Sequence, residues 1–307
     1  MLIIRRPRQP GEEPAPARPS DRGGRIAALV VLAVLLVVYT PVFAHAVEVW
    51  SLDEEFSFAF LVPPISAGLF WLRRDSILRS VGRGSDLGLL LLAGGLLVLV
   101  AGARAGVRAG VHAGVHAVEG ASFVVTALGV VAYLYGVATA RRAAFPIAFL
   151  AFGLCLYRGL LVSVGFFLQN LTARLSARAA ALFGVTVHRV GVDLFAGKFH
   201  FVVAEACSGM SSLLALLCLG TAMVGLAQSS LPRRALLLLL IVPIVLVANI
   251  FRVTLVLALA QVVGLAVVNS IIHGAFSAII FLIAFGLFLL MGKVLGCYPR
   301  IGALLSS

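Results

Sequence analysis

The sequence predicts an all-α integral membrane protein with about eight transmembrane helices in one domain. Of the 307 residues, 62% are hydrophobic and only 12% are charged, and the mean hydropathy is +1.12. Water-soluble domains carry roughly a quarter charged residues, so this chain has too little polar surface to cover a globule of its size in water. The basic residues also fall in short clusters between long apolar runs, as the loops of a multi-pass protein do.

The apolar runs indicate where the helices lie. The first run, residues 26–44, is long enough to cross a bilayer, which takes about 20 residues. It lacks the short core and cleavage site of a signal peptide, so we expect a retained helix. The second run, residues 58–72, contains Pro63 and Pro64 and is expected to be broken. The remaining runs are residues 87–103, 121–140, 143–163, 208–228, 235–264 and 272–292.

Composition also divides the chain. Residues 1–24 are rich in Pro, Arg and Gly and have no apolar period, so we expect a disordered cytoplasmic tail. A polytopic transmembrane domain over residues 25–295 and a cytoplasmic C-terminal tail over residues 296–307 follow. The basic clusters flank alternate connections, which places both termini in the cytoplasm under the positive-inside rule. We expect a multi-pass membrane protein.

The net charge of +12 could suggest nucleic acid as a partner. We exclude that partner, because the basic residues do not form one stripe. Arginines and histidines do recur at every fourth position of the repeat over residues 101–120. That spacing puts them on one helix face, where they could bind a metal or an anion. A slipped repeat that extends the third helix explains the pattern more simply.

Two small elements are expected at the outer face. Residues 164–185 carry Arg174 and Arg178 among apolar residues, which favours an amphipathic helix lying in the interface. Residues 186–204 alternate between polar and apolar, and the pair Gly197–Lys198 reads as a turn. These features predict a small external hairpin of two strands that leads into the sixth span.

One cysteine differs from the others in its surroundings. Cys207 lies in the run AEACSGMSS, where the hairpin ends and a helix begins. The free N–H groups and partial positive charge of a helix N-terminus stabilise a thiolate. Cys155 and Cys218 lie inside apolar runs and are expected to be buried hydrophobic residues. No CxxC pair occurs, so we expect neither a metal site nor a cofactor.

Two further polar residues come to the same membrane side. Arg252, in VANIFRVTLV, lies 18 residues after Arg234, which is roughly 27 Å along a helix. A charge at mid-bilayer costs at least about 2.5–3.5 kcal/mol, so Arg252 either has a function or reaches the outer headgroups. His273, in NSIIHGAFS, opens the last span. A thiolate nucleophile, an imidazole and a cationic oxyanion stabiliser are the groups that acyl transfer needs.

These segments resemble a known family. The runs ACSG at 206–209, ANIFR at 248–252 and HG at 273–274 are similar to the exosortase/archaeosortase family of membrane transpeptidases. The resemblance covers most of residues 26–292. It departs from the family at Phe58–Ala59, where a His-Gly is often found, and at Tyr157–Arg158, where a Pro-rich stretch is usual.

The resemblance implies a cysteine protease/transpeptidase that cleaves the C-terminal sorting signals of exported proteins at the outer face of the membrane, through a thioester. Such a signal has a short PEP-type motif, a hydrophobic helix and a basic tail. Cys207 would be the nucleophile, Arg252 the electrostatic stabiliser and His273 the acid/base. Glu205 could cap the sixth helix or orient a base. Asn249, one turn before Arg252, could hold the guanidinium or bond to another helix.

Other readings stay open. A serine enzyme would use Ser208 with His273 but would leave Arg252 unexplained. The sequence has no HExxH motif and no aspartate at the centre of a span, which disfavours metalloproteases and aspartate pairs. In a transporter, Arg252 would bind an anion. The chain could also be a non-enzymatic subunit of an exopolysaccharide export assembly. The substrate protein, the acceptor, and the choice between hydrolysis and transfer are not encoded in these patterns.

Overall fold

The computed structural model describes residues 22–109, 112–155, 158–203, 209–264 and 273–297. The chain divides into two compact units, Met1–Thr40 and Pro41–Ser307. The first contains helix α1, Arg22–Val38. The sixth-helix segment that holds Glu205, Cys207 and Ser208 lies outside the described residues.

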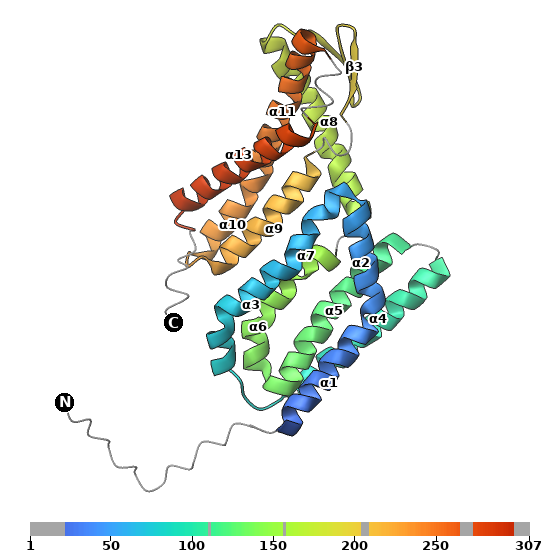
Figure 1. Ribbon diagram of the computed structural model, residues 1–307, viewed down its shortest axis with the longest axis vertical. Coiled ribbons are helices and arrows are strands. Elements are labelled where there is room, and N and C mark those ends of the chain that lie inside the picture. Colours follow the sequence, from blue (N-terminus) through green and yellow to red (C-terminus); the bar gives the residue numbers. More distant parts are fainter. Residues whose placement is uncertain (1–21, 110–111, 156–157, 204–208, 265–272, 298–307) are drawn as a thin grey trace, which may run out of the picture. The chain divides into compact units, whose positions relative to one another are not determined.

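Helices make up most of the second unit (Figure 1). Its first half contains α2 Thr40–Leu52, the 3-10 helix η1 Glu54–Leu61, α3 Val62–Arg79, α4 Asp86–Ala109, α5 His112–Tyr135, α6 Val137–Phe149, α7 Ala151–Leu154 and α8 Arg158–Leu182. Strands β1 Val187–Val190, β2 Asp193–Ala196 and β3 Phe199–Val202 follow. The last part contains α9 Met210–Leu226, α10 Leu231–Leu239, α11 Ile241–Val263 and α13 His273–Val294.

The described helices confirm an all-α integral membrane protein. Five stretches are long and apolar enough to cross a bilayer: Glu55–Arg79, Asp86–Arg104, His116–Tyr135, Val137–Leu154 and Leu231–Val262. The pair Ala28–Val38 and Thr40–Leu52 makes a sixth if it is taken as one span, and Met210–Leu226 and Ala278–Val294 are apolar but shorter. By length and composition the described residues thus support five or six spans, and the number eight stays a prediction.

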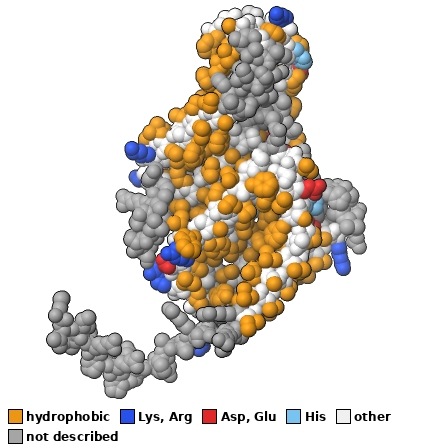
Figure 2. Space-filling view, viewed as in Figure 1, with side chains coloured by type: hydrophobic (Ala, Val, Ile, Leu, Met, Phe, Trp, Pro, Cys, Tyr) orange, Lys and Arg blue, Asp and Glu red, His pale blue; other side chains and the backbone are white. Residues whose placement is uncertain are grey.

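The surface has the character that lipid contact requires. Figure 2 shows hydrophobic side chains over most of the described surface on the face it presents, with few charged groups. Large apolar side chains such as Leu97, Val247 and Leu290 are 70%, 64% and 52% exposed. In water, apolar patches of this extent would be an aggregation hazard. In a bilayer they are the outer surface of the bundle.

Glycine and proline set several helix boundaries that apolarity did not reveal. The helix expected over residues 121–140 ends at Tyr135, because Gly136 adopts a φ of 90°. A β-carbon at that position would lie 2.6 Å from Arg83 O, so only glycine fits. Arg141 therefore lies inside α6 and not in a loop. Pro63 occupies the first turn of α3, where its missing N–H costs nothing.

The bounds expected for the helix over residues 143–163 and for the interfacial helix over residues 164–185 are both corrected, whereas the interfacial position of the second stays a prediction. The first ends at Leu154, and a single helix of 25 residues, α8, then runs to Leu182. The face of α8 that carries Ala173, Ser176 and Ala180 is buried. Small residues let helix backbones approach closely, and α8 packs along α11. Much of α8 is therefore a packed element of the bundle.

The external strands form a three-stranded antiparallel sheet in the order β1-β2-β3, not the two-stranded hairpin that we expected. The expected turn at Gly197–Lys198 joins β2 and β3. A second turn interrupts the first expected strand, because Gly191 adopts a φ of 63°. The inner face of the sheet packs on α8 and α11 in one cluster: Ala173, Ala180, Leu194, Ala196, Val203, Val253 and Leu257.

The main core surrounds α9. Buried side chains of α2, η1, α3, α6 and α13 pack against Leu214, Leu216 and Cys218. At the C-terminal end of α9, Arg73 Nη2 donates to Gly225 O and Arg234 Nη2 donates to Ala227 O, both at 2.5 Å. The last carbonyls of a helix lack partners within it and carry partial negative charge, so the two guanidinium groups hold this end of α9.

The repeat over residues 101–120 is divided between two helices, since α4 continues to Ala109 and α5 begins at His112. Its first half therefore extends the third predicted helix as expected, whereas its two histidines belong to the next helix. His116 Nδ1 lies 3.0 Å from Glu119 Oε2, and its ring centroid lies 3.7 Å from that of His45. Within the described ranges, no group of three His, Cys, Asp or Glu side chains could hold a metal ion.

Candidate active site

The structure describes the three residues expected to carry the chemistry to different extents. Arg252 lies within α11 and is half-buried. His273 is the first residue of α13, and only its place in the helix is described. Cys207 lies outside the described residues. What the structure does show is how the chain is held on both sides of the segment that contains Cys207.

The chain enters that segment from a fixed point, Val203. This residue is buried in the cluster between the sheet, α8 and α11. Its N–H donates to Val192 O at 3.0 Å, and its carbonyl accepts a hydrogen bond from Gln169 Nε2 on α8. Both backbone groups of the last described residue before residue 204 therefore have partners.

The chain leaves the segment at a second fixed point, Gly209, the N-cap of α9. Gly209 is buried and adopts the left-handed conformation, with a φ of 84°. L-residues with a side chain rarely adopt it. A β-carbon there would lie 3.2 Å from Asn249 Cγ. The backbone conformation therefore favours glycine, and any side chain would in addition have to displace Asn249 by a few tenths of an ångström. The start of α9 thus lies directly against α11.

Asn249 in turn is tied to a third helix. Its side chain is only 5% exposed, and its Nδ2 donates to Thr172 Oγ1 at 3.2 Å. Thr172 lies on α8 and is fully buried. Of the two roles that the sequence left open for Asn249, the structure shows the hydrogen bond between helices. The start of α9, α11 and α8 meet at this point.

Further contacts hold α11 along its length. Ser176 Oγ on α8 donates to Ile250 O at 3.3 Å, and Gln261 Nε2 donates to Ala196 O at 3.1 Å. Arg252 lies between these contacts, one helical turn beyond Asn249. Helix α11 also packs against α13, which begins with His273. The helices that carry the two charged or titratable candidates are therefore neighbours.

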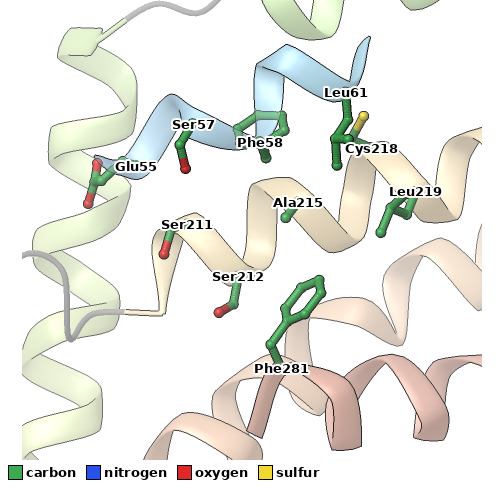
Figure 3. A pocket seen from close by; sticks show the side chains of 10 residues that line it. All are labelled: Glu55, Ser57, Phe58, Leu61, Ser211, Ser212, Ala215, Cys218, Leu219 and Phe281. Carbon is green, nitrogen blue, oxygen red and sulfur yellow. The ribbon is translucent and has the colours of Figure 1, made fainter. Parts of the chain in front are cut away.

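A groove opens beside the first turns of α9. Its volume is about 350 Å³, near the lower end of the range for ligand pockets. Figure 3 shows polar side chains toward the start of α9 and apolar ones further along it. The lining comprises Glu55, Ser57, Phe58, Leu61, Ser211, Ser212, Ala215, Cys218, Leu219 and Phe281.

Comparison with known proteins identifies the family of this chain. The family described as transmembrane exosortase matches residues 50–290. The chain belongs to the transmembrane exosortase family. The match runs from the end of α2 into α13 and therefore includes Cys207, Arg252 and His273. Neither the curated proteins nor the solved structures gave a match.

The exosortase has supporting residues that sequence reasoning missed. Thr172 and Gln169 both lie on α8, where they hold Asn249 and the carbonyl of Val203. A signal for them exists: threonine and glutamine among apolar residues one turn apart suggest polar contacts between helices. Their partners could not be found from the sequence, because Val203 lies 34 positions after Gln169 and Asn249 lies 77 positions after Thr172.

Proposed function

We propose that this exosortase is a membrane-embedded cysteine protease/transpeptidase that cleaves C-terminal sorting signals of exported proteins at the outer face of the membrane. One observation carries the proposal. The segment with Cys207 is anchored at Val203 and at Gly209, and Gly209 lies against Asn249, one turn from Arg252. Nucleophilic catalysis needs such a rigid frame, because reacting groups must be held within a narrow range of positions.

The reaction follows from the chemistry of three side chains. The Cys207 thiolate attacks the carbonyl carbon of the scissile peptide bond, and the resulting oxyanion is stabilised by the Arg252 guanidinium. As the C–N bond breaks, the imidazolium of His273 gives its proton to the leaving amine. This leaves a thioester on Cys207. Water or an acceptor amine then attacks the thioester, transfers a proton to His273 and releases the thiolate.

The substrates in this proposal are exported proteins with a PEP-type motif, a hydrophobic helix and a basic tail. The hydrophobic helix lies in the same bilayer as the exosortase, and the basic tail stays on the cytoplasmic side. Anchoring in the membrane restricts the search of the two proteins to two dimensions and brings the motif to the outer face. Neither a cofactor nor a metal takes part in these steps.

The direct test compares single-cysteine variants on a protein that carries such a signal. Cys207→Ala is expected to abolish cleavage and the thioester adduct. Cys155→Ala, in a half-buried thiol outside the groove, is expected to retain most activity. Full cleavage by Cys207→Ala would remove the cysteine mechanism and favour Ser208. Normal export without any cleavage in the parent protein would favour the transporter or the assembly subunit.

The orientation is a second part of the proposal: eight passes, with both termini in the cytoplasm of a bacterial inner membrane. Reporter fusions after residues 80 and 233 should then report the cytoplasm, and a fusion at residue 190 in β1 should report the outside. A cytoplasmic signal at residue 190 would place the sheet and the start of α9 on the wrong side for exported substrates.

A further inference from the structure

We propose that the groove between η1 and α9 binds the first turn of the substrate's own transmembrane helix, immediately after the cleaved bond. This inference rests on the proposed function, since it assigns a subsite to that reaction. All residues named as lining the groove are described, and the part of the substrate assigned to it follows the scissile bond.

The groove runs along one face of α9. Ser211, Ala215 and Leu219 line it from that helix, at spacings of four residues that place them on one face. From Ser211 to Leu219 the face extends roughly 12 Å along the helix axis. Residues of η1 line it from the other side, and Phe281 of α13 lies across from them (Figure 3).

The groove begins where the nucleophile's segment ends. Ser211 is four positions after Cys207 and two after Gly209, which is held against Asn249. From its first turn the groove then follows α9 away from that end, toward Leu219. A substrate whose scissile bond is at the start of α9 therefore has one of its two sides directed along the groove. Because α9 is apolar, we assign that side to the substrate's hydrophobic helix.

The polarity of the groove matches the start of a membrane helix. The first N–H groups of any helix lack partners within the helix and carry partial positive charge, and leaving them unpaired in lipid costs several kcal/mol. The Glu55 carboxylate and the hydroxyl groups of Ser57 and Ser211 offer acceptors at the polar end. Leu61, Leu219 and other apolar side chains at the far end can contact the first apolar side chains of the substrate.

Size and charge favour this occupant over a phospholipid. About 350 Å³ accommodates a few side chains and not a whole helix, which limits the contact to roughly one turn. The oxygens at the polar end can accept hydrogen bonds from the first N–H groups of a helix, whereas a lipid phosphate has no N–H group to donate. An acyl chain in the apolar part is the alternative that the experiment must separate.

The test uses variants that narrow or widen the groove, each measured on substrates that differ at the start of the hydrophobic helix. The substrates carry either leucine or alanine at the first four positions of the hydrophobic helix. Ala215→Trp should lower kcat/KM for the leucine substrate by about tenfold or more, the scale on which apolar pockets discriminate, and should affect the alanine substrate less. Leu219→Ala, which enlarges the groove, should raise kcat/KM for a third substrate, with tryptophan at those positions, relative to the leucine substrate.

Two exposed residues outside the groove serve as controls, Leu282 on α13 and Glu48 on α2. Leu282→Trp is adjacent to Phe281 but 63% exposed, so it should leave both substrates within about twofold of the parent. Glu55→Gln should raise KM by about two- to fivefold, as loss of a charge at a helix N-terminus does, without slowing thioester formation at saturation. Glu48→Gln, on the exposed side of α2, should change neither.

The outcomes separate the two levels of the proposal. If the parent protein forms no Cys207-dependent product, the function itself is wrong. If the parent cleaves and Ala215→Trp treats both substrates as the parent does, the groove assignment is overturned while the function stands. A photo-crosslinker at residue 219 should capture the substrate helix, and one at residue 282 should not. Capture of lipid alone at residue 219 would also overturn the assignment.

Discussion

Gly209 rests on the side chain of Asn249, and a single β-carbon added to the glycine would come within 3.2 Å of Asn249 Cγ. This contact joins the start of α9 to α11, two residues after Cys207 and one helical turn before Arg252. The amide of Asn249 continues the connection to Thr172 on α8. A change in either residue should therefore displace the start of α9 relative to α11.

Substitution of Gly209 should lower the free energy of unfolding by more than the strain of the left-handed backbone accounts for. Gly209→Ala is expected to pay about 1–2 kcal/mol for the left-handed backbone and an additional penalty for the collision with Asn249. Gly184 offers a matched control, since it has a φ of 77° with nothing within 4 Å of a β-carbon. Gly184→Ala should be destabilised only by the strain of the left-handed backbone. Thermal unfolding in detergent and the cleavage rate measure the difference, and equal effects would show that the contact is unimportant.

Thr172 and Thr254 form a second matched pair, because both are buried threonines on the packed helices α8 and α11. Thr172→Val removes the acceptor for buried Asn249 Nδ2 and should cost about 1–3 kcal/mol. Thr254 Oγ1 has no hydrogen-bond partner among the described residues, so Thr254→Val should be neutral or stabilising. Thermal melts of the two variants decide this, and cleavage should fall in Thr172→Val only.

Arg252 should act on the rate and not on substrate capture. If its guanidinium stabilises the oxyanion, the interaction is stronger in the transition state than in the ground state. Arg252→Ala should then slow turnover by about 10²–10³, or roughly 2.7–4 kcal/mol, and Arg252→Lys should recover part of that loss because lysine lacks the planar fork.

The control for Arg252 is Arg174, an exposed arginine on the neighbouring helix α8. Arg174→Ala should leave turnover unchanged. Substrate crosslinking and expression should be measured on the same variants. Lost crosslinking with a normal chemical step would reassign Arg252 to binding of the sorting signal, and lost expression would reassign it to folding.

His273 should set one limb of the pH profile. An imidazole changes its charge between about pH 5 and 8, and the reaction needs it protonated when the amine leaves and neutral when the acceptor attacks. Activity should therefore pass through a maximum with pH. In His273→Ala the rate should fall and one limb should vanish. A variant that keeps both limbs would show that another group controls proton transfer.

The apolar runs predicted that helices exist, but not where they break. Apolarity continues through Gly136, because both flanking helices belong to the membrane region, whereas the break itself depends on a φ of 90° beside Arg83 O. Hydropathy contains no term for backbone conformation. The same limit applies near Cys155, where one apolar run covers the end of α7 and the start of α8.

The two arginines of α8 did not reveal how its other face packs. Arg174 and Arg178 are exposed, as an interfacial helix requires, yet the opposite face carries Thr172, Ser176 and Ala180 and is buried against a neighbour. Which helix covers a face of small residues depends on tertiary packing. The groove escaped notice for a related reason, since Ser57 and Ser211 come together from positions more than 150 residues apart.

The short length of α9 affects the depth at which its first residues lie in the bilayer. Its 17 residues span roughly 25 Å, whereas the hydrocarbon core is about 30 Å thick. Arg73 and Arg234 hold its C-terminal end with cationic groups that prefer the headgroup region. The other end then stops short of the opposite headgroups, and because the core surrounds α9, neighbouring helices and not lipid cover this difference in length. A substrate helix beside α9 would begin at the same reduced depth, so its first peptide bonds would be accessible without withdrawal of that helix from the membrane.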